Sequence, residues 1–237
     1  MGDERDLEID DLINNLDKEY HSAHPATNGS YLTIQKSREL NSLIQLWTHE
    51  RTCPDILPYA HELLDTILDR VRGQIEVIEE YTTSADSSGN AKLKVLFVET
   101  ELERVKFLVR GYLRARIHKI DNYYMHILNN PDVQRKLSQS ELRYTKRRAN
   151  QLKRYYNLRF LSSLPQLLQR LDDTAGGLQM VDEPDLDEVV FIRVLRDAPG
   201  EVDLGNDDKI ELRKGNIYVL PYRVIRQYVD DGDVQLV

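Results

Sequence analysis

Cysteine is almost absent from this chain, which has only Cys53 among its 237 residues. A single cysteine excludes a disulfide within the chain and a zinc site built from several thiolates. It also favours a reducing compartment, where disulfides are rare. Long apolar runs are missing too: no stretch approaches the roughly 20 apolar residues of a membrane-spanning helix, so we expect no such span.

Sequence motifs that hold nucleotides or metals are also missing. The chain has neither a GxxxxGK(S/T) phosphate loop nor a GxGxxG fingerprint, and none of its six histidines forms an HExxH pair. Neighbouring acids such as Asp207 and Asp208 fall in polar segments where turn chemistry explains them. The sequence therefore predicts no cofactor, no metal and no enzymatic activity.

Charge is distributed unevenly along the chain. The formal net charge is −8 overall, with −6 in residues 1–30, −9 in residues 172–237 and +7 in residues 31–171. A basic middle between acidic ends indicates acidic partners for the middle, although these need not be nucleic acids.

The hydrophobic pattern changes from a helical period to a strand period at an acidic, glycine-containing segment. We therefore predict an α plus small β fold: an N-terminal all-α helical bundle followed by a small C-terminal β-rich domain. The expected parts are a disordered tail with a short partner-binding helix at 1–30, a helical domain at 31–171, a linker at 172–186 and the β-rich domain at 187–237. A domain of about 50 residues is small, so we expect it to lean on something larger.

Four helices are expected in the helical domain. They run over 35–50, from a start near 54–58 onward, over 92–127, and from Ser138 onward, where Glu141 stands in capping-box register. A shorter helical segment is expected around 158–171.

Strands are expected in the last 50 residues. The pattern predicts a strand at 189–195, a long turn region at 197–208 and two strands around Gly215. One or two helical turns at 224–228 and a final strand at 234–237 complete the expected order.

The third helix carries a wide apolar face with charged flanks, which is typical of a helix that binds other protein surfaces. Arg116 falls within that apolar face. Its stem could run along apolar surface with the guanidinium in water, or the guanidinium could form an ion pair across a helix interface. The apolar face consists of Leu102, Val105, Val109, Tyr112, Leu113 and Ile120.

The fourth helix is strongly basic. Residues 135–159 hold nine arginines and lysines against one acid, Glu141, with tyrosines interleaved. Such a face could contact DNA phosphates or an acidic protein. We favour the acidic protein because base-reading and stacking motifs are absent. The candidate contact residues are Arg143, Lys146, Arg147, Lys153 and Arg154.

The acidic tail contains one amphipathic pattern. Ile9, Leu12, Ile13 and Leu16 recur at three- and four-residue steps. Such a short helix is marginal alone and is typical of a peptide that binds a groove on another protein. It could instead pack on its own domain. We favour an external partner because a polar spacer follows it.

Several motifs occur along the chain in one order. They are Trp47-Thr-His-Glu50-Arg51 with Pro54-Asp-Ile-Leu57-Pro58-Tyr59, then Glu99-Thr-Glu101-Leu-Glu103-Arg104 with Phe107, Tyr112-Leu113-Arg114-Ala-Arg116 and Lys119-Ile120, then Asp182-Glu183-Pro184-Asp185 with Val190-Phe191-Ile192, and finally Gly215-Asn-Ile-Tyr218-Val219, Tyr222-Arg-Val-Ile225-Arg226 and Val234-Gln-Leu236-Val237. In order and spacing the chain resembles the Sld-five family of GINS subunits of eukaryotic DNA replication, in its fungal form.

This resemblance implies a nuclear, non-catalytic subunit of a heterotetramer with three Psf subunits. That tetramer would join the MCM motor ring and the RecJ-like co-activator in the replicative DNA helicase, for initiation and fork progression. The alternative is a DNA-binding module that uses the basic helix at 135–159. On the family reading we expect Arg116 to be buried and paired with a carboxylate. The implied interface and framework residues are Glu101, Glu103, Arg104, Tyr112, Arg114, Arg116, Phe191, Leu236 and Val237.

The tail resembles the short peptide by which fungal Sld-five proteins and DNA polymerase alpha dock on a trimeric replisome adaptor. The resemblance implies that Leu12, Ile13 and Leu16 fill the adaptor groove, while nearby acids accept hydrogen bonds or meet basic groups. The implied adaptor-binding residues are Ile9, Asp10, Asp11, Leu12, Ile13, Leu16, Asp17 and Glu19.

Overall fold

A computed structural model describes residues 29–83, 89–165, 169, 180–197, 201–205 and 208–237. These residues belong to two compact units. The first contains the described residues before Leu46 and those between Ala60 and Gly111. The second contains Leu46–Tyr59 and the described residues from Tyr112 onward. Two helices, α2 (Gly29–Thr52) and α4 (Gly89–Asn129), contribute residues to both units.

The first unit is built from α2, α3 (His61–Thr83) and the N-terminal part of α4. Leu64, Ile67 and Val71 recur at helical spacing along α3 and are buried, because side chains at that spacing share one helix face. An Arg70–Glu39 ion pair joins α3 to α2.

Helix α3 begins later than expected. The predicted start near 54–58 is wrong, because the helix begins at His61. Each proline disfavours the helical conformation of the residue before it. Residues 53–57 are instead buried in a non-helical segment of the second unit.

The helices of the second unit follow one another closely. Helix α4 is interrupted at Tyr123, where the backbone leaves helical geometry. It is followed by α5 (Pro131–Arg135), which was not predicted, and by α6 (Gln139–Arg159) with a 3-10 turn, η1 (Leu161–Ser163). The predicted capping box of α6 is confirmed. The Ser138 hydroxyl accepts from the Glu141 amide at 3.2 Å, and the Glu141 carboxylate accepts from the Ser138 amide at 2.8 Å.

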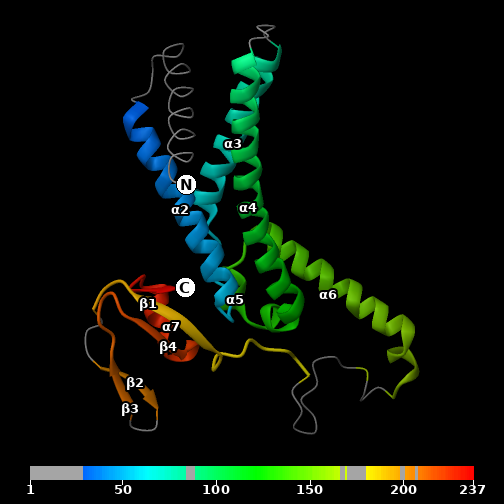
Figure 1. The fold of residues 1–237 in the computed structure, drawn as a ribbon. Helices are drawn as coiled ribbons and strands as arrows, with labels where there is room; N and C mark the ends of the chain where they lie inside the picture. The colour runs from blue at the N-terminus through cyan, green and yellow to red at the C-terminus, as the bar shows by residue number, and fades with distance from the viewer. Residues whose placement is uncertain (1–28, 84–88, 166–168, 170–179, 198–200, 206–207) are drawn as a thin grey trace. The chain divides into compact units, whose positions relative to one another are not determined.

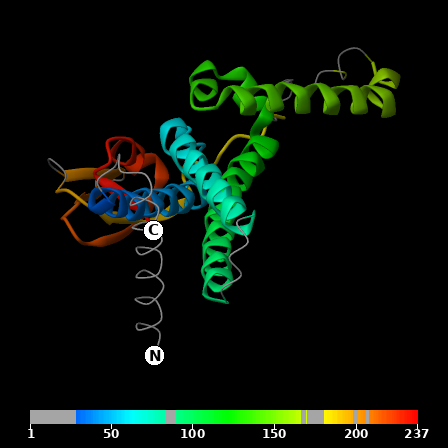
Figure 2. The same ribbon diagram turned by 90° about the horizontal axis from the view of Figure 1, so that it is seen from above.

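The C-terminal module is antiparallel. Strand β1 (Val189–Val194) lies between β4 (Ile217–Pro221) and β5 (Val234–Leu236), and β2 (Glu201–Gly205) pairs with β3 (Asp208–Glu211) as a separate ribbon. Helix α7 (Tyr222–Asp230) packs on β4 and β5, and both views show it beside the sheet (Figures 1 and 2). A helical region followed by a small antiparallel sheet confirms the predicted fold class.

The core of this module follows from strand alternation. Val190, Ile192 and Val194 of β1 point inward and are buried, whereas their neighbours on the strand are exposed. Tyr222 and Ile225 of α7 cover them. Alternate side chains of a strand lie on opposite faces, and no described residue outside the sheet is seen to cover its other face, where Val189 and Phe191 are exposed.

One predicted turn region contains a strand. The expectation of a long turn at 197–208 is wrong, because β2 occupies Glu201–Gly205. Val202 is buried while Asp203 is exposed. The alternation of apolar and polar residues in β2 is only a few residues long. It lies among acids and glycines, which are rare in strands, so the sequence did not indicate a strand here.

Candidate functional site

Arg116 is the centre of a buried polar cluster in the second unit. All five of its N–H donors are used. Nε and Nη2 donate to the two carboxylate oxygens of Glu141 at 2.7 and 3.1 Å. Nη1 donates to Glu50 at 3.0 Å and to the Leu57 carbonyl at 2.6 Å, and Nη2 also reaches the Lys136 carbonyl at 3.2 Å. The side chain is 0% exposed, so the prediction that Arg116 is buried and paired with a carboxylate is confirmed.

Two aromatic rings complete the surroundings of this guanidinium. Its carbon lies 5.3 Å from the ring centre of Tyr59 and 5.7 Å from that of Tyr112. Burial acts to lower the pKa of Arg116, but the hydrogen bonds to Glu141 and the charge of Glu50 outweigh it and raise the pKa above the ordinary value. The guanidinium is therefore charged and has no free donor for a ligand.

Three segments, from two distant regions of the chain, supply the partners of Arg116. Glu141 is available because it caps the first turn of α6. Glu50 lies in the last turn of α2, and the Leu57 carbonyl belongs to the non-helical segment that follows. A substituted Arg116 would leave all three segments without their shared donor.

Further ion pairs extend the cluster toward the C-terminal module. Lys119 bridges Glu50 at 2.9 Å and the Asp55 carbonyl at 2.7 Å. The Asp55 carboxylate lies 2.9 Å from Lys136 and 3.1 Å from Arg226 of α7. Sequence reasoning did not find these residues as a group, although Glu50, Lys119 and Arg226 stand inside the motifs that carried the family resemblance.

Cys53 lies in the apolar core shared with the C-terminal module, beside Tyr222. Burial raises the pKa of the Cys53 thiol to about 11. Such a thiol is protonated near neutral pH and is a poor nucleophile. Burial also raises the pKa of Tyr222. Cys53 and Tyr222 therefore serve the packing of the core.

Within the described part of the chain, no group of three or more His, Cys, Asp or Glu side chains could hold a metal ion. No described helix combines the length and apolar character that crossing a membrane requires.

The predicted interface and framework residues differ in burial. Tyr112, Arg116 and Leu236 are buried, so the structure places them inside the fold. Glu101 is half-buried and pairs with Arg104 at 2.7 Å within one turn of α4. The remaining residues of the prediction are exposed; they are Glu103, Arg104, Arg114, Phe191 and Val237.

The basic residues of α6 form an exposed face. The neighbouring Arg148 is tied down, because it pairs with Asp121 at 3.4 Å, to which Tyr144 also donates at 2.9 Å. Tyr155 is 53% exposed, and the Arg159 guanidinium lies 5.4 Å from its ring centre. The five predicted contact residues, Arg143, Lys146, Arg147, Lys153 and Arg154, are all exposed.

The exposed face of the β4-β1-β5 sheet carries several apolar side chains. Phe191 is 58% exposed and stands opposite Val219, which is 50% exposed. Val189 and Ile217 are exposed on the same two strands. The Val237 amide donates to the Phe191 carbonyl, which places the exposed Val237 beside Phe191. A contiguous apolar patch on a protein surface marks an interaction site.

The predicted adaptor-binding residues from Ile9 to Glu19 lie outside the described residues.

Comparison with known proteins agrees with the motif pattern. The model of the GINS complex protein helical bundle domain matches residues 73–159, and that of the DNA replication complex GINS protein SLD5 C-terminus matches residues 184–237. The chain is 40% identical over 232 residues to the DNA replication complex GINS protein SLD5 of Yarrowia lipolytica. The aligned residues cover 98% of this chain and 85% of that relative. This chain belongs to the SLD5 family of GINS proteins.

Other SLD5 proteins match over similar lengths. The Schizosaccharomyces pombe protein is 35% identical over 86% of this chain and 94% of its own length. The Saccharomyces cerevisiae protein is 30% identical over 98% of this chain and all of its own length. The resemblance to the Sld-five family is thereby confirmed. The helical-bundle match contains both Arg116 and Glu141, and the C-terminal match contains the whole β1–β5 module.

Proposed function

We propose that this chain is a non-catalytic subunit of the GINS complex in DNA replication. The observation that carries this proposal is its identity to SLD5 proteins over nearly its whole length. The site geometry supports a structural role, because the Arg116 donors are all used within the fold. The exposed apolar sheet face around Phe191 and Val219 supports contact with other subunits.

In the finer form of the proposal, the chain assembles with the three Psf subunits. The resulting tetramer is a structural part of the nuclear replicative helicase, together with the MCM ring and the RecJ-like co-activator. It serves initiation and fork progression. The division into a tail at 1–30, a helical domain at 31–171, a linker at 172–186 and a β-rich domain at 187–237 stays part of the proposal.

The tail adds a second contact. We propose that residues 9–19 dock on a trimeric replisome adaptor as a short amphipathic helix. The sequence supports this through apolar residues at helical spacing among acids.

Co-expression with the Psf subunits tests the assembly. We expect an equimolar tetramer, and poor solubility of the chain alone, because the apolar sheet face would then meet water. A chain that stays monomeric beside all three Psf subunits would contradict the proposal.

A surface variant locates the contact. Phe191→Asp with Val219→Asp should weaken incorporation at least about tenfold, since a charge placed in an apolar interface is left unpaired. Gln227→Asp, which adds one negative charge on the exposed side of α7, is the control and should assemble normally.

A DNA-binding function of α6 is the second candidate, favoured by the five exposed arginines and lysines predicted as contacts and by Tyr155 beside Arg159. It would give binding to a short fluorescent DNA that weakens steeply as salt rises. Lys146→Glu with Arg147→Glu should then make the fall of DNA affinity with salt less steep, by the amount expected for the loss of about two phosphate contacts. Unchanged DNA binding in this variant would reject the DNA-binding function of α6 and favour an acidic protein as its partner.

A further inference from the structure

A stripe of arginines runs along the solvent side of α6. Arg143, Arg147 and Arg154 lie within about 40° of one another around the helix, and Leu158 continues the stripe by one turn. These four side chains are exposed, whereas Thr145, on the opposite side of the helix, is 0% exposed. From Arg143 to Leu158 the stripe is roughly 22 Å long.

The charges of this stripe are not neutralised within the described part of the chain. There, no ion pair or side-chain hydrogen bond joins Arg143, Arg147 or Arg154 to another residue. The one acid of α6, Glu141, is buried against Arg116 and is therefore not available to them. Like charges that crowd one face repel one another, so an acidic partner would relieve the repulsion.

Apolar side chains stand at the C-terminal end of the arginine stripe. Leu158 is 75% exposed, Tyr155 is 53% exposed, and Phe160, just after the helix, is 47% exposed. An exposed apolar group of this kind marks an interaction site. A surface that joins a basic stripe to apolar side chains is complementary to an acidic segment with an apolar ridge.

The tail of this chain has that composition. Residues 1–30 have a net charge of −6, and all of their charged side chains lie before residue 21. Drawn as a helix, the tail places Leu12, Ile13 and Leu16 on one apolar ridge. Acids flank the ridge on both sides, with Asp17 on one side and Glu19 on the other.

We propose that the tail docks on the arginine stripe of α6 in its own chain. Its apolar ridge packs on Tyr155 and Leu158, and its acids pair with Arg147 and Arg154. A segment in the same chain as its binding surface meets that surface at a high effective concentration whenever the connecting residues span the distance.

This contact is autoinhibitory toward the adaptor. The docked tail covers the same ridge that the adaptor groove would receive, so the two contacts exclude each other. The consequence for the adaptor rests on the proposed docking of residues 9–19, whereas the contact with α6 does not.

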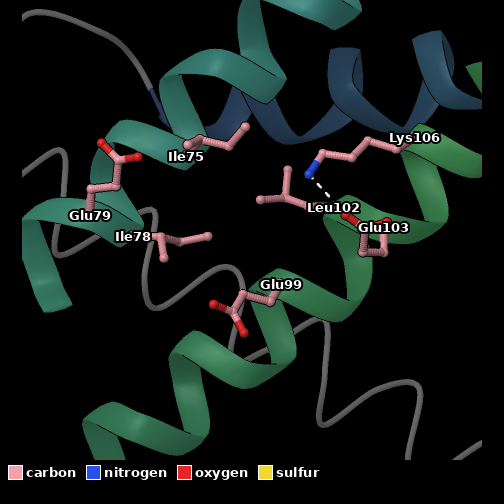
Figure 3. A pocket seen from close by; sticks show the side chains of 7 residues that line it. All are labelled: Ile75, Ile78, Glu79, Glu99, Leu102, Glu103 and Lys106. Atoms are coloured by element: carbon pink, nitrogen blue, oxygen red, sulfur yellow. Dashed lines mark hydrogen bonds and ion pairs between the residues drawn. The ribbon is translucent and has the colours of Figure 1, made fainter.

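Charge argues against another site for the tail. The hollow of about 780 Å³ between α3 and α4 has apolar walls at Ile75 and Leu102, but three glutamates and a single lysine also line it (Figure 3). An acidic segment would be repelled there. The C-terminal part of the chain, with a net charge of −9 over residues 172–237, would repel it as well.

The apolar end of the stripe favours the tail over DNA. Phosphates would meet the arginines equally well. An exposed leucine at position 158 adds nothing to phosphate binding, whereas it extends the contact with an apolar ridge.

Crosslinking in the assembled complex tests the contact. The full-length chain, with a benzophenone amino acid in place of Leu158, is co-expressed with its GINS partners. We expect a crosslink to residues 1–20 of the same molecule. Arg147→Glu with Arg154→Glu should lower the yield of this crosslink at least about fivefold, because like charges across a contact suppress association.

The matched control is Lys214→Glu with Arg223→Glu, which has the same charge change at exposed positions of the C-terminal module. It should keep the wild-type crosslink yield. Equal yields from the two double variants would overturn the α6 contact. A crosslink of position 158 to another subunit, to a second copy or to nothing would overturn it too, as would loss of assembly in the Arg147→Glu, Arg154→Glu variant alone.

Adaptor binding is the second readout, measured with Leu158 in place. A tail that is docked most of the time binds with reduced apparent affinity, so the Arg147→Glu, Arg154→Glu complex should bind the adaptor trimer about five- to tenfold tighter than the control complex. Equal affinities would overturn the autoinhibitory role. Absence of adaptor binding in every complex would instead reject the proposed adaptor docking, while the crosslink still decides the α6 contact.

Discussion

Arg116 and Glu141 are 25 residues apart in the chain, yet Nε and Nη2 of the guanidinium contact both carboxylate oxygens. The same carboxylate accepts the Ser138 amide at the start of α6. Glu141 thus fixes the first turn of a helix and orients a buried arginine at once. Removing either charge would leave the other buried without its main partner, which is costlier than never having buried the pair.

Truncation of the arginine should destabilise the fold strongly. We expect Arg116→Met to lower the free energy of unfolding by about 3–5 kcal/mol, because Glu50 and Glu141 would remain as uncompensated buried charges. Urea unfolding followed by circular dichroism measures this. Arg114→Met, at an exposed position two residues earlier, should change stability by less than about 0.5 kcal/mol. Similar losses in the two variants would refute the structural role of the cluster.

Asp55 should hold α7 through its charge. Asp55→Asn keeps an oxygen for the Ile56 amide but weakens the contacts to Lys136 and Arg226. We expect a loss of about 1.5–3 kcal/mol, the range for hydrogen bonds to charged groups. Hydrogen exchange should be faster in α7.

The control for this variant is Asp187→Asn, whose pair with Arg223 is exposed at both partners. Surface pairs contribute little, so its exchange pattern should match that of the wild type. Protection of α7 that is equal in both variants would argue against a role for the Asp55 charge.

Stability should fall in alkali because of Cys53. The folded pKa of about 11 is above the ordinary value of 9.0, so between these pH values the unfolded thiol loses its proton while the folded one keeps it. Unfolding then releases a proton, and stability falls as pH rises, by up to about 3 kcal/mol. Cys53→Ala should lack this part of the slope. Urea unfolding across this pH window compares the two chains, and parallel slopes would contradict the assignment.

The tail peptide gives a test that does not depend on the fold. A labelled peptide of residues 1–22 should bind the adaptor trimer in fluorescence anisotropy, and Leu12→Ala with Ile13→Ala should abolish binding by removing the groove-filling side chains. Asn14→Ala with Asn15→Ala, off the apolar face, is the matched control. Equal binding of the two double variants would reject the docking peptide.

Sequence reasoning found the features that depend on neighbours in the chain. The long third helix, the Ser138–Glu141 cap and the strand at 189–194 follow from period, capping chemistry and alternation, and the structure contains all three. It missed β2, whose short alternation is hidden among acids. It also placed the start of α3 too early, because proline suits a first helical turn but equally suits the non-helical segment found here.

The sequence by itself determined that a helical region precedes a β-rich one, the family, and the anomaly of a charge at position 116 within an apolar stripe. Only the tertiary structure decided that Glu50, 66 residues away, and Glu141 both meet that charge. It also decided that Cys53 packs with Tyr222 and that Ile75 and Ile78 are left partly uncovered beside acids. Helical period fixes which face a side chain occupies, whereas its partner depends on how distant segments pack, and no local pattern encodes that.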